Sequence, residues 1–161
     1  MGSVIIDRAK IQLSDLSKER LVIAIRWLCM ALFIYTAYAK ITDHVRFLNG
    51  LENVHIISGF ALVISFMVPI VEIIVASLLL IPVTAKLGLY SFIVVMAIFT
   101  GYIISVLIWE NNLPCHCGGA IERLSWSQHI WFNLTFLSIA IFALWLINLN
   151  TSLKIKKNEK F

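Results

Sequence analysis

Residues 87–109 read LGLYSFIVVMAIFTGYIISVLIW, an uninterrupted run of 23 residues without a charged side chain. At about 1.5 Å per residue, a helix of this length crosses a hydrocarbon core of about 30 Å. Three other apolar runs of comparable length lie at residues 21–39, 56–83 and 130–149. Within the four runs, only Arg26 and Glu72 carry a charge. The pattern predicts an all-α fold, an integral membrane four-helix bundle.

The composition excludes several classes of protein. Of the 161 residues, 60% are hydrophobic and 14% are charged, and the mean hydropathy is +0.91, whereas an average soluble domain carries roughly 25% charged residues. A soluble enzyme domain, a disordered chain and a disulfide-framed secreted domain are therefore excluded. The net charge of +4 does not indicate nucleic-acid binding, because the basic residues stand at the ends of the apolar runs, where they suit membrane lipid.

The basic residues also predict the orientation. Four spans put both termini on one side, which holds nine Lys and Arg residues, against Lys40, Arg46 and Arg123 on the other side. Because short cytoplasmic loops are rich in Lys and Arg, both termini are predicted to be cytoplasmic. The loops at 40–55 and 110–128 then face outward, which in a bacterium is the periplasm. We expect a multi-pass protein of the bacterial inner (plasma) membrane.

The chain divides into three parts. Residues 1–20 are a cytoplasmic N-terminal segment, residues 21–150 are the four-span domain, and residues 151–161 are a basic cytoplasmic tail. The apolar residues of the first segment have the spacing of a short amphipathic helix that lies on the inner membrane surface. A frayed polar tail is an equal alternative.

Two cysteines dominate the second outward loop. Cys115 and Cys117 flank His116, follow a proline and precede two glycines. A disulfide between them would close a very small, strained ring and would exchange readily, and His116 and Arg123 are placed to stabilise a thiolate. This favours a redox-active pair, with an inert structural disulfide or a copper or zinc site as alternatives. No metal is predicted, because three adjacent residues wrap an ion poorly and the sequence has no second ligand cluster.

The other candidates are polar residues within or near the runs. A carboxylate inside a span costs about 2.5–3.5 kcal/mol, so Glu72 is expected to face the bundle interior with a partner. Arg26 is the charged partner within the runs. Glu72 is either a proton- or quinone-site residue or a structural lock between the first two helices. Cys29, in the middle of the first run, is predicted to be a packing residue.

Four residues near the outer ends of the spans complete the list. Lys40, Asp43 and His129 are expected to lie close enough to approach the cysteine loop. Lys40 and Asp43 could instead pair with each other at a helix end, and His129 could be an ordinary interfacial residue. Asn133 lies four residues after His129 and shares its helix face.

The order of these motifs resembles the MauE family, named for methylamine utilisation, within the wider DoxX-like membrane proteins. The resemblance runs from about Arg26 to Leu146. It depends on Tyr38-Ala-Lys40-Ile-x-Asp43, Pro69-x-x-Glu72, Pro114-Cys115-x-Cys117-Gly118, and Ser125-Trp126 followed by Asn133. The common family form reads Cys-Gly-Cys-Phe-Gly, so this chain departs at His116 and Gly118 and keeps the dithiol.

The resemblance implies an inner-membrane protein that works with a periplasmic thioredoxin-like protein to form or pass disulfides. DoxX-like relatives are linked to quinone-coupled sulfur oxidation, which implies a quinone as a candidate electron acceptor; the residues themselves indicate no cofactor. Two rivals remain open. One is a non-enzymatic membrane scaffold or assembly factor with a structural disulfide. The other is a small-ligand or metal carrier that uses Glu72 and the cysteines.

Overall fold

The computed structural model describes residues 2–54, 57–109 and 125–158. They form five α-helices and one short 3-10 helix: α1 (Gly2–Thr42), α2 (His44–Glu52), η1 (Ser58–Phe60), α3 (Ala61–Leu80), α4 (Ala85–Trp109) and α5 (Trp126–Asn158). No β-strand occurs among the described residues, so the predicted all-α class is confirmed.

Four of these helices are long and apolar enough to cross a membrane. The candidate spans are Leu16–Thr42, Ser58–Leu80, Ala85–Trp109 and Ser127–Leu149, which confirms the four predicted spans. The second span is shorter than its apolar run because α3 ends at Leu80 and Ile81 is extended. Ile81 precedes Pro82, and the residue before a proline is driven out of the helical region.

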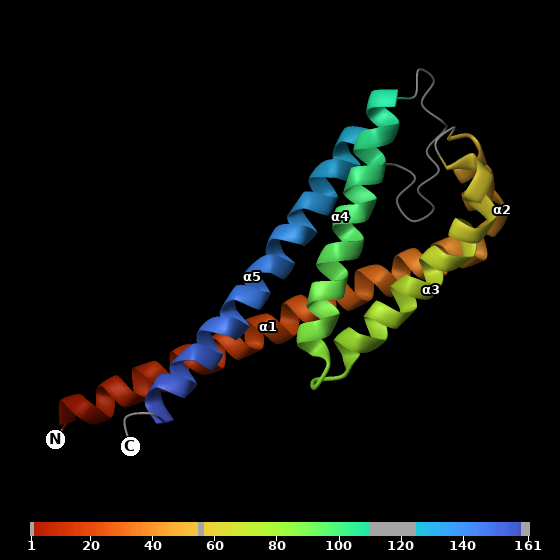
Figure 1. Ribbon diagram of the computed structural model, residues 1–161. Coiled ribbons are helices and arrows are strands. Elements are labelled where there is room, and N and C mark those ends of the chain that lie inside the picture. The colour runs from red at the N-terminus through yellow and green to blue at the C-terminus, as the bar shows by residue number, and fades with distance from the viewer. Residues whose placement is uncertain (1, 55–56, 110–124, 159–161) are drawn as a thin grey trace.

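The helices pack as an up-and-down bundle with an extra helix at one end. α1 packs mainly against α3, and α4 packs mainly against α5. Both termini and the α3–α4 turn lie at one end, whereas α2, the end of α4 and the start of α5 lie at the other, which we call the α2 end (Figure 1). The termini therefore share a side of the bundle. Their cytoplasmic location stays a prediction.

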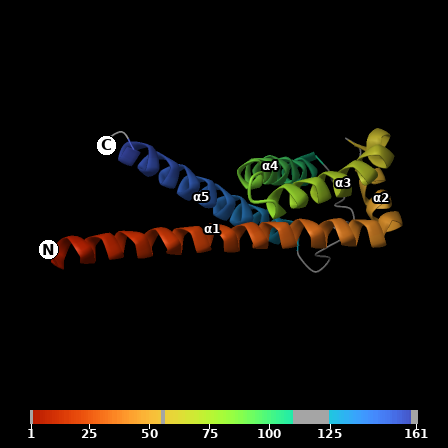
Figure 2. The same ribbon diagram turned by 90° about the horizontal axis from the view of Figure 1, so that it is seen from below.

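The first helix is longer than the sequence suggests. α1 runs without a break from Gly2 to Thr42 and extends along the whole molecule, with α3 beside its second half (Figure 2). The helix therefore includes residues 2–20, and the location of this segment on the membrane surface stays a prediction. Lys, Arg and Glu, which make up most of the charged residues here, are good helix formers, so a helix can continue through them.

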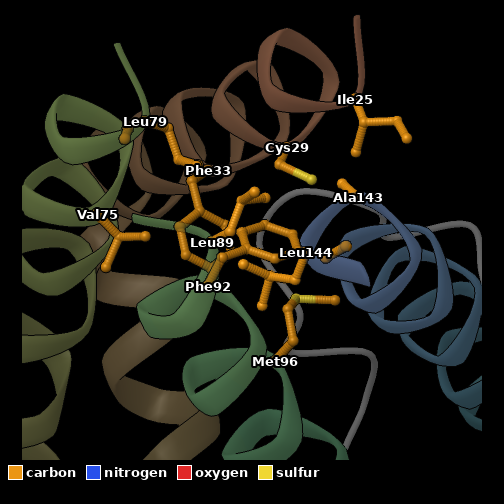
Figure 3. Close-up of a cluster of buried hydrophobic side chains, with 12 residues drawn as sticks. Ile25, Cys29, Phe33, Val75, Leu79, Leu89, Phe92, Met96, Ala143 and Leu144 are labelled. Carbon is orange, nitrogen blue, oxygen red and sulfur yellow. The ribbon is translucent and has the colours of Figure 1, made fainter. Parts of the chain in front are cut away.

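The core lies where the four spanning helices meet. It contains Phe33 of α1, Leu79 of α3 and Phe92 of α4, and the rings of Phe33 and Phe92 have centroids 4.5 Å apart (Figure 3). Cys29 is fully buried in this cluster. This position agrees with the prediction that Cys29 is a packing residue.

Two local devices shape the connections between the spans. A Cβ on Gly88 would lie 2.9 Å from the Leu79 nitrogen and 3.0 Å from the Leu78 carbonyl carbon, so α4 approaches the end of α3 more closely than a side chain allows.

At the start of α5, the Ser125 hydroxyl accepts from the Gln128 N–H at 3.3 Å, and the Gln128 side chain accepts from the Ser125 N–H at 2.8 Å. This reciprocal capping box sets where the fourth span begins.

Candidate functional site

A buried ion pair joins α1 to α3. Lys40 lies in the last turn of α1 and Glu72 lies in the middle of α3. The distance from Lys40 Nζ to Glu72 Oε1 is 2.7 Å, and the exposed fractions of the two residues are 8% and 1%. Two opposite charges thus lie inside the bundle, where the surrounding side chains are largely apolar.

The predicted pairing of Glu72 with Arg26 is wrong. Arg26 donates to the carbonyl oxygens of Leu79, at 2.8 and 3.3 Å, and of Leu80, at 3.4 Å. The reason is the register of two antiparallel helices: residue 26 of α1 lies beside the end of α3, and Glu72 lies about two turns farther along. The guanidinium satisfies carbonyls that the end of α3 leaves without helical donors.

Thr36 completes the polar contacts of the Glu72 carboxylate. Its hydroxyl donates to Glu72 Oε1 at 3.0 Å and lies 3.2 Å from the Phe33 carbonyl oxygen. Lys40 Nζ also reaches the Thr36 carbonyl oxygen at 3.5 Å. Oε1 therefore accepts two hydrogen bonds, whereas the buried Oε2 has no hydrogen-bond partner in the described part of the chain.

Two aromatic rings border the Lys40 ammonium. Nζ lies 5.8 Å from the ring centroid of Phe47 and 5.6 Å from that of Phe99. Phe47 comes from α2 and, with Leu51, is buried in a small apolar cluster that includes Ala61 at the start of α3. α2 therefore packs across the end of the bundle and brings an aromatic ring over the ion pair.

A second polar contact lies near this end of α3. His44 Nε2 is 3.1 Å from the hydroxyl oxygen of Ser65, and that hydroxyl donates to the Leu62 carbonyl oxygen at 2.7 Å. Because the hydroxyl hydrogen is used, Nε2–H of His44 is the donor to Ser65. Ser65 is fully buried, and the His44 ring packs on Phe66 with centroids 4.5 Å apart.

The structure separates the other predicted residues. Asp43 pairs with Arg46 at 3.1 Å on the surface, so the alternative pairing of Lys40 with Asp43 is wrong. Asn133 is buried and His129 is half-buried, both near the start of α5. Cys115, His116 and Cys117 lie outside the described residues, between the end of α4 and the start of α5. Among the described residues, no group of three His, Cys, Asp or Glu residues could hold a metal ion.

Sequence reasoning missed Thr36, Phe47, Phe99, His44 and Ser65. Only Thr36 carried a usable signal, because it precedes Lys40 by one helical turn and therefore shares its face. The contacts of Phe47 and Phe99 depend on how α2 and α4 pack, which no local pattern reports.

Comparisons with known proteins give one match. The family model described as "Methylamine utilisation protein MauE" matches residues 18–146. The matched region covers most of the chain, including the Lys40–Glu72 pair and the two cysteines of the α4–α5 connection. No curated protein and no solved structure matches the chain.

Proposed function

This chain belongs to the MauE family of methylamine utilisation proteins, and from that premise we propose that it is a membrane-bound thiol–disulfide redox protein. Cys115 and Cys117 are the redox pair, and a thioredoxin-like protein of the periplasm is the partner. The four candidate spans and the family membership support this role, because they hold the two cysteines in a connection at the membrane surface.

One observation carries the proposal: two cysteines, one residue apart, stand in the connection between two spans. The helix ends that flank this connection, at Trp109 and Trp126, belong to the α2 end of the bundle (Figure 1). Lys40 lies in the last turn of α1, the turn that precedes α2. A Cys-x-Cys disulfide is strained, so it is a better oxidant than an unstrained structural disulfide.

The proposed exchange proceeds through a mixed disulfide. A thiolate of the partner attacks one sulfur of the Cys115–Cys117 disulfide and releases the other as a thiolate. The second thiolate of the partner then attacks the mixed disulfide, which leaves the partner oxidised and Cys115 and Cys117 reduced. His116 is the residue between the two cysteines, and its positively charged imidazolium form stabilises the released thiolate.

Reoxidation needs an acceptor for two electrons and two protons. A quinone in the bilayer meets this need, because it takes up two electrons and two protons when it is reduced to the quinol. We assign a supporting role beside the dithiol to four residues near the end of α1 and the start of α5: Lys40, Asp43, His129 and Asn133. Glu72 takes part through its contact with Lys40.

Thiol trapping in intact cells tests the proposal. Free thiols are blocked with a mass-adding maleimide, with and without a pulse of reductant, in a Cys29→Ser background so that Cys115 and Cys117 are the only thiols. A pair that shifts between oxidised and reduced forms as the partner is added or removed supports the redox role. A pair that stays oxidised under all conditions supports the rival, a scaffold with a structural disulfide.

Metal analysis of the full chain, purified without chelator, tests the carrier alternative. Bound copper or zinc in proportion to the protein, lost in Cys115→Ser, would replace the redox role with a metal-carrier role.

A further inference from the structure

We propose that Oε2 of Glu72 is a proton-exchange site, held in place by Lys40, between α1 and α3 in the interior of the bundle. The site takes up one proton, which converts the Glu72 carboxylate to the neutral acid, and later releases it. The inference depends on the contacts of the described residues and does not need the cysteine chemistry.

The hydrogen bonds of the Glu72 carboxylate are shared unequally between its two oxygens. An ionised carboxylate offers about four acceptor positions on two oxygens. Oε1 accepts from Lys40 at 2.7 Å and from Thr36 at 3.0 Å. Oε2 accepts no hydrogen bond from the described residues, although only 1% of Glu72 is exposed. A buried, unbonded and negatively charged acceptor is costly, and a proton on Oε2 removes that charge while both hydrogen bonds to Oε1 stay in place.

The asymmetry also argues against a purely structural ion pair. A buried ion pair stabilises a fold when further hydrogen bonds satisfy the remaining lone pairs of the carboxylate. Here both available donors, the Lys40 ammonium and the Thr36 hydroxyl, bind the same oxygen. The other oxygen accepts no hydrogen bond from the described residues, so a proton can bind it without displacing a donor.

Lys40 has contacts that do not depend on the charge of Glu72. Protonation of Glu72 removes the negative charge and leaves the ammonium without its counter-ion. Lys40 retains the Thr36 carbonyl oxygen at 3.5 Å and the rings of Phe47 and Phe99 at 5.8 and 5.6 Å. Cation–π contacts stabilise an ammonium without a carboxylate. The site therefore accommodates Lys40 in both charge states of Glu72.

Among the described titratable groups on the helices that pack against α3, Lys40 is the one in contact with Glu72. On α1, Tyr35 and Tyr38 are more than half exposed, and Arg26 binds the end of α3. On α2, His44 binds Ser65, and Asp43 before it pairs with Arg46. On α4, the titratable residues are Lys86 and Tyr90, near the α3–α4 turn, and Tyr102, near the opposite end of the helix.

Infrared spectroscopy of the full chain in lipid nanodiscs tests the inference. The spectrum of Glu72→Gln is subtracted from that of the unmodified chain at each pH of a titration, so that the difference isolates the Glu72 carboxyl. We expect the carboxylate band to be replaced by a carboxylic acid band as the pH falls, with one proton taken up per chain. The acid band should shift in D₂O, because the proton exchanges with solvent.

Two variants that keep both charges control for misfolding of Glu72→Gln. Thr36→Val removes the hydroxyl that binds Oε1 and should displace the midpoint of the Glu72 transition. Thr42→Val is the matched control, because the Thr42 hydroxyl binds only the carbonyl oxygens of Tyr38 and Ala39 among described contacts. It should leave the midpoint unchanged.

The inference is overturned if the Glu72 band stays a carboxylate over the whole pH range in which circular dichroism shows an intact helical fold. It is also overturned if Thr36→Val and Thr42→Val give the same midpoint. The double variant Cys115→Ser/Cys117→Ser separates this inference from the redox proposal: the Glu72 transition should persist in it even if the redox proposal fails.

Discussion

Lys40 and Glu72, 32 residues apart in the chain, form the one ion pair among the described residues that is buried between two spanning helices. The pair and its contacts come from four helices: Thr36 and Lys40 belong to α1, Phe47 to α2, Glu72 to α3 and Phe99 to α4. The pair therefore couples the packing of the bundle to the charge state of one carboxyl group.

Removal of one member of this pair should destabilise the fold more than removal of both. Lys40→Met leaves a buried carboxylate without a cation and should cost about 3–5 kcal/mol. The double variant Lys40→Met/Glu72→Leu should cost clearly less, because no buried charge remains. The free energy of unfolding, from detergent titration of all four members of the cycle, measures the coupling. Additive costs would contradict the buried pair.

Arg26→Gln should weaken the end of α3 without affecting Glu72. The guanidinium donates to the Leu79 and Leu80 carbonyl oxygens, and loss of a hydrogen bond from a charged donor costs about 1.5 kcal/mol. The same unfolding titration measures the loss, with Arg20→Gln at an exposed position of α1 as the control. A change in the infrared band of Glu72 in Arg26→Gln would restore the rejected Arg26–Glu72 pair.

Gly88→Ala should disrupt the α3–α4 turn, whereas Gly101→Ala should not. The new Cβ at position 88 would meet backbone atoms of Leu78 and Leu79, but the Cβ at position 101 has nothing within 4 Å. Overpacking against backbone costs about 1–3 kcal/mol, whereas alanine in an open helical position stabilises by up to about 1 kcal/mol. Melting temperatures of both variants check the contrast. Equal shifts would mean that α4 does not approach α3 this closely.

Replacement of one cysteine of the proposed redox pair should trap the partner. Because the exchange is reversible, the lone thiolate of a single variant can attack the disulfide of the oxidised partner. Without the second cysteine this mixed disulfide is not resolved, so a covalent adduct should accumulate. We expect the stronger trap in Cys117→Ser, with Cys115 in the mixed disulfide and Cys117 as the missing resolving thiol. Non-reducing gels with and without reductant detect the adduct. Cys29→Ser, in the core, should trap nothing, and an absence of adducts in both single variants would favour the scaffold alternative.

The predicted orientation has its own test. In a Cys29→Ser background, a membrane-impermeant maleimide should label Cys115 or Cys117 of reduced, intact spheroplasts if both termini are cytoplasmic. Labelling that requires lysis would reverse the orientation and remove the periplasmic partner from the proposal.

Much of the fold follows from the sequence because it depends on properties of single segments. Whether a run of apolar residues spans a membrane is decided by its own length and transfer free energy. The end of α3 before Pro82 is likewise local. The continuous α1 was not predicted, because charged residues mark the end of an apolar run without ending a helix.

The candidate site divides in the same way. The sequence alone determined that Glu72 needs a buried partner, since a carboxylate inside a span is costly, and that Lys40 stands at the end of the first span. Only the tertiary structure decided that these two meet and that Arg26 binds the end of α3. Both outcomes depend on the register between antiparallel α1 and α3, which many side-chain contacts across the bundle determine together.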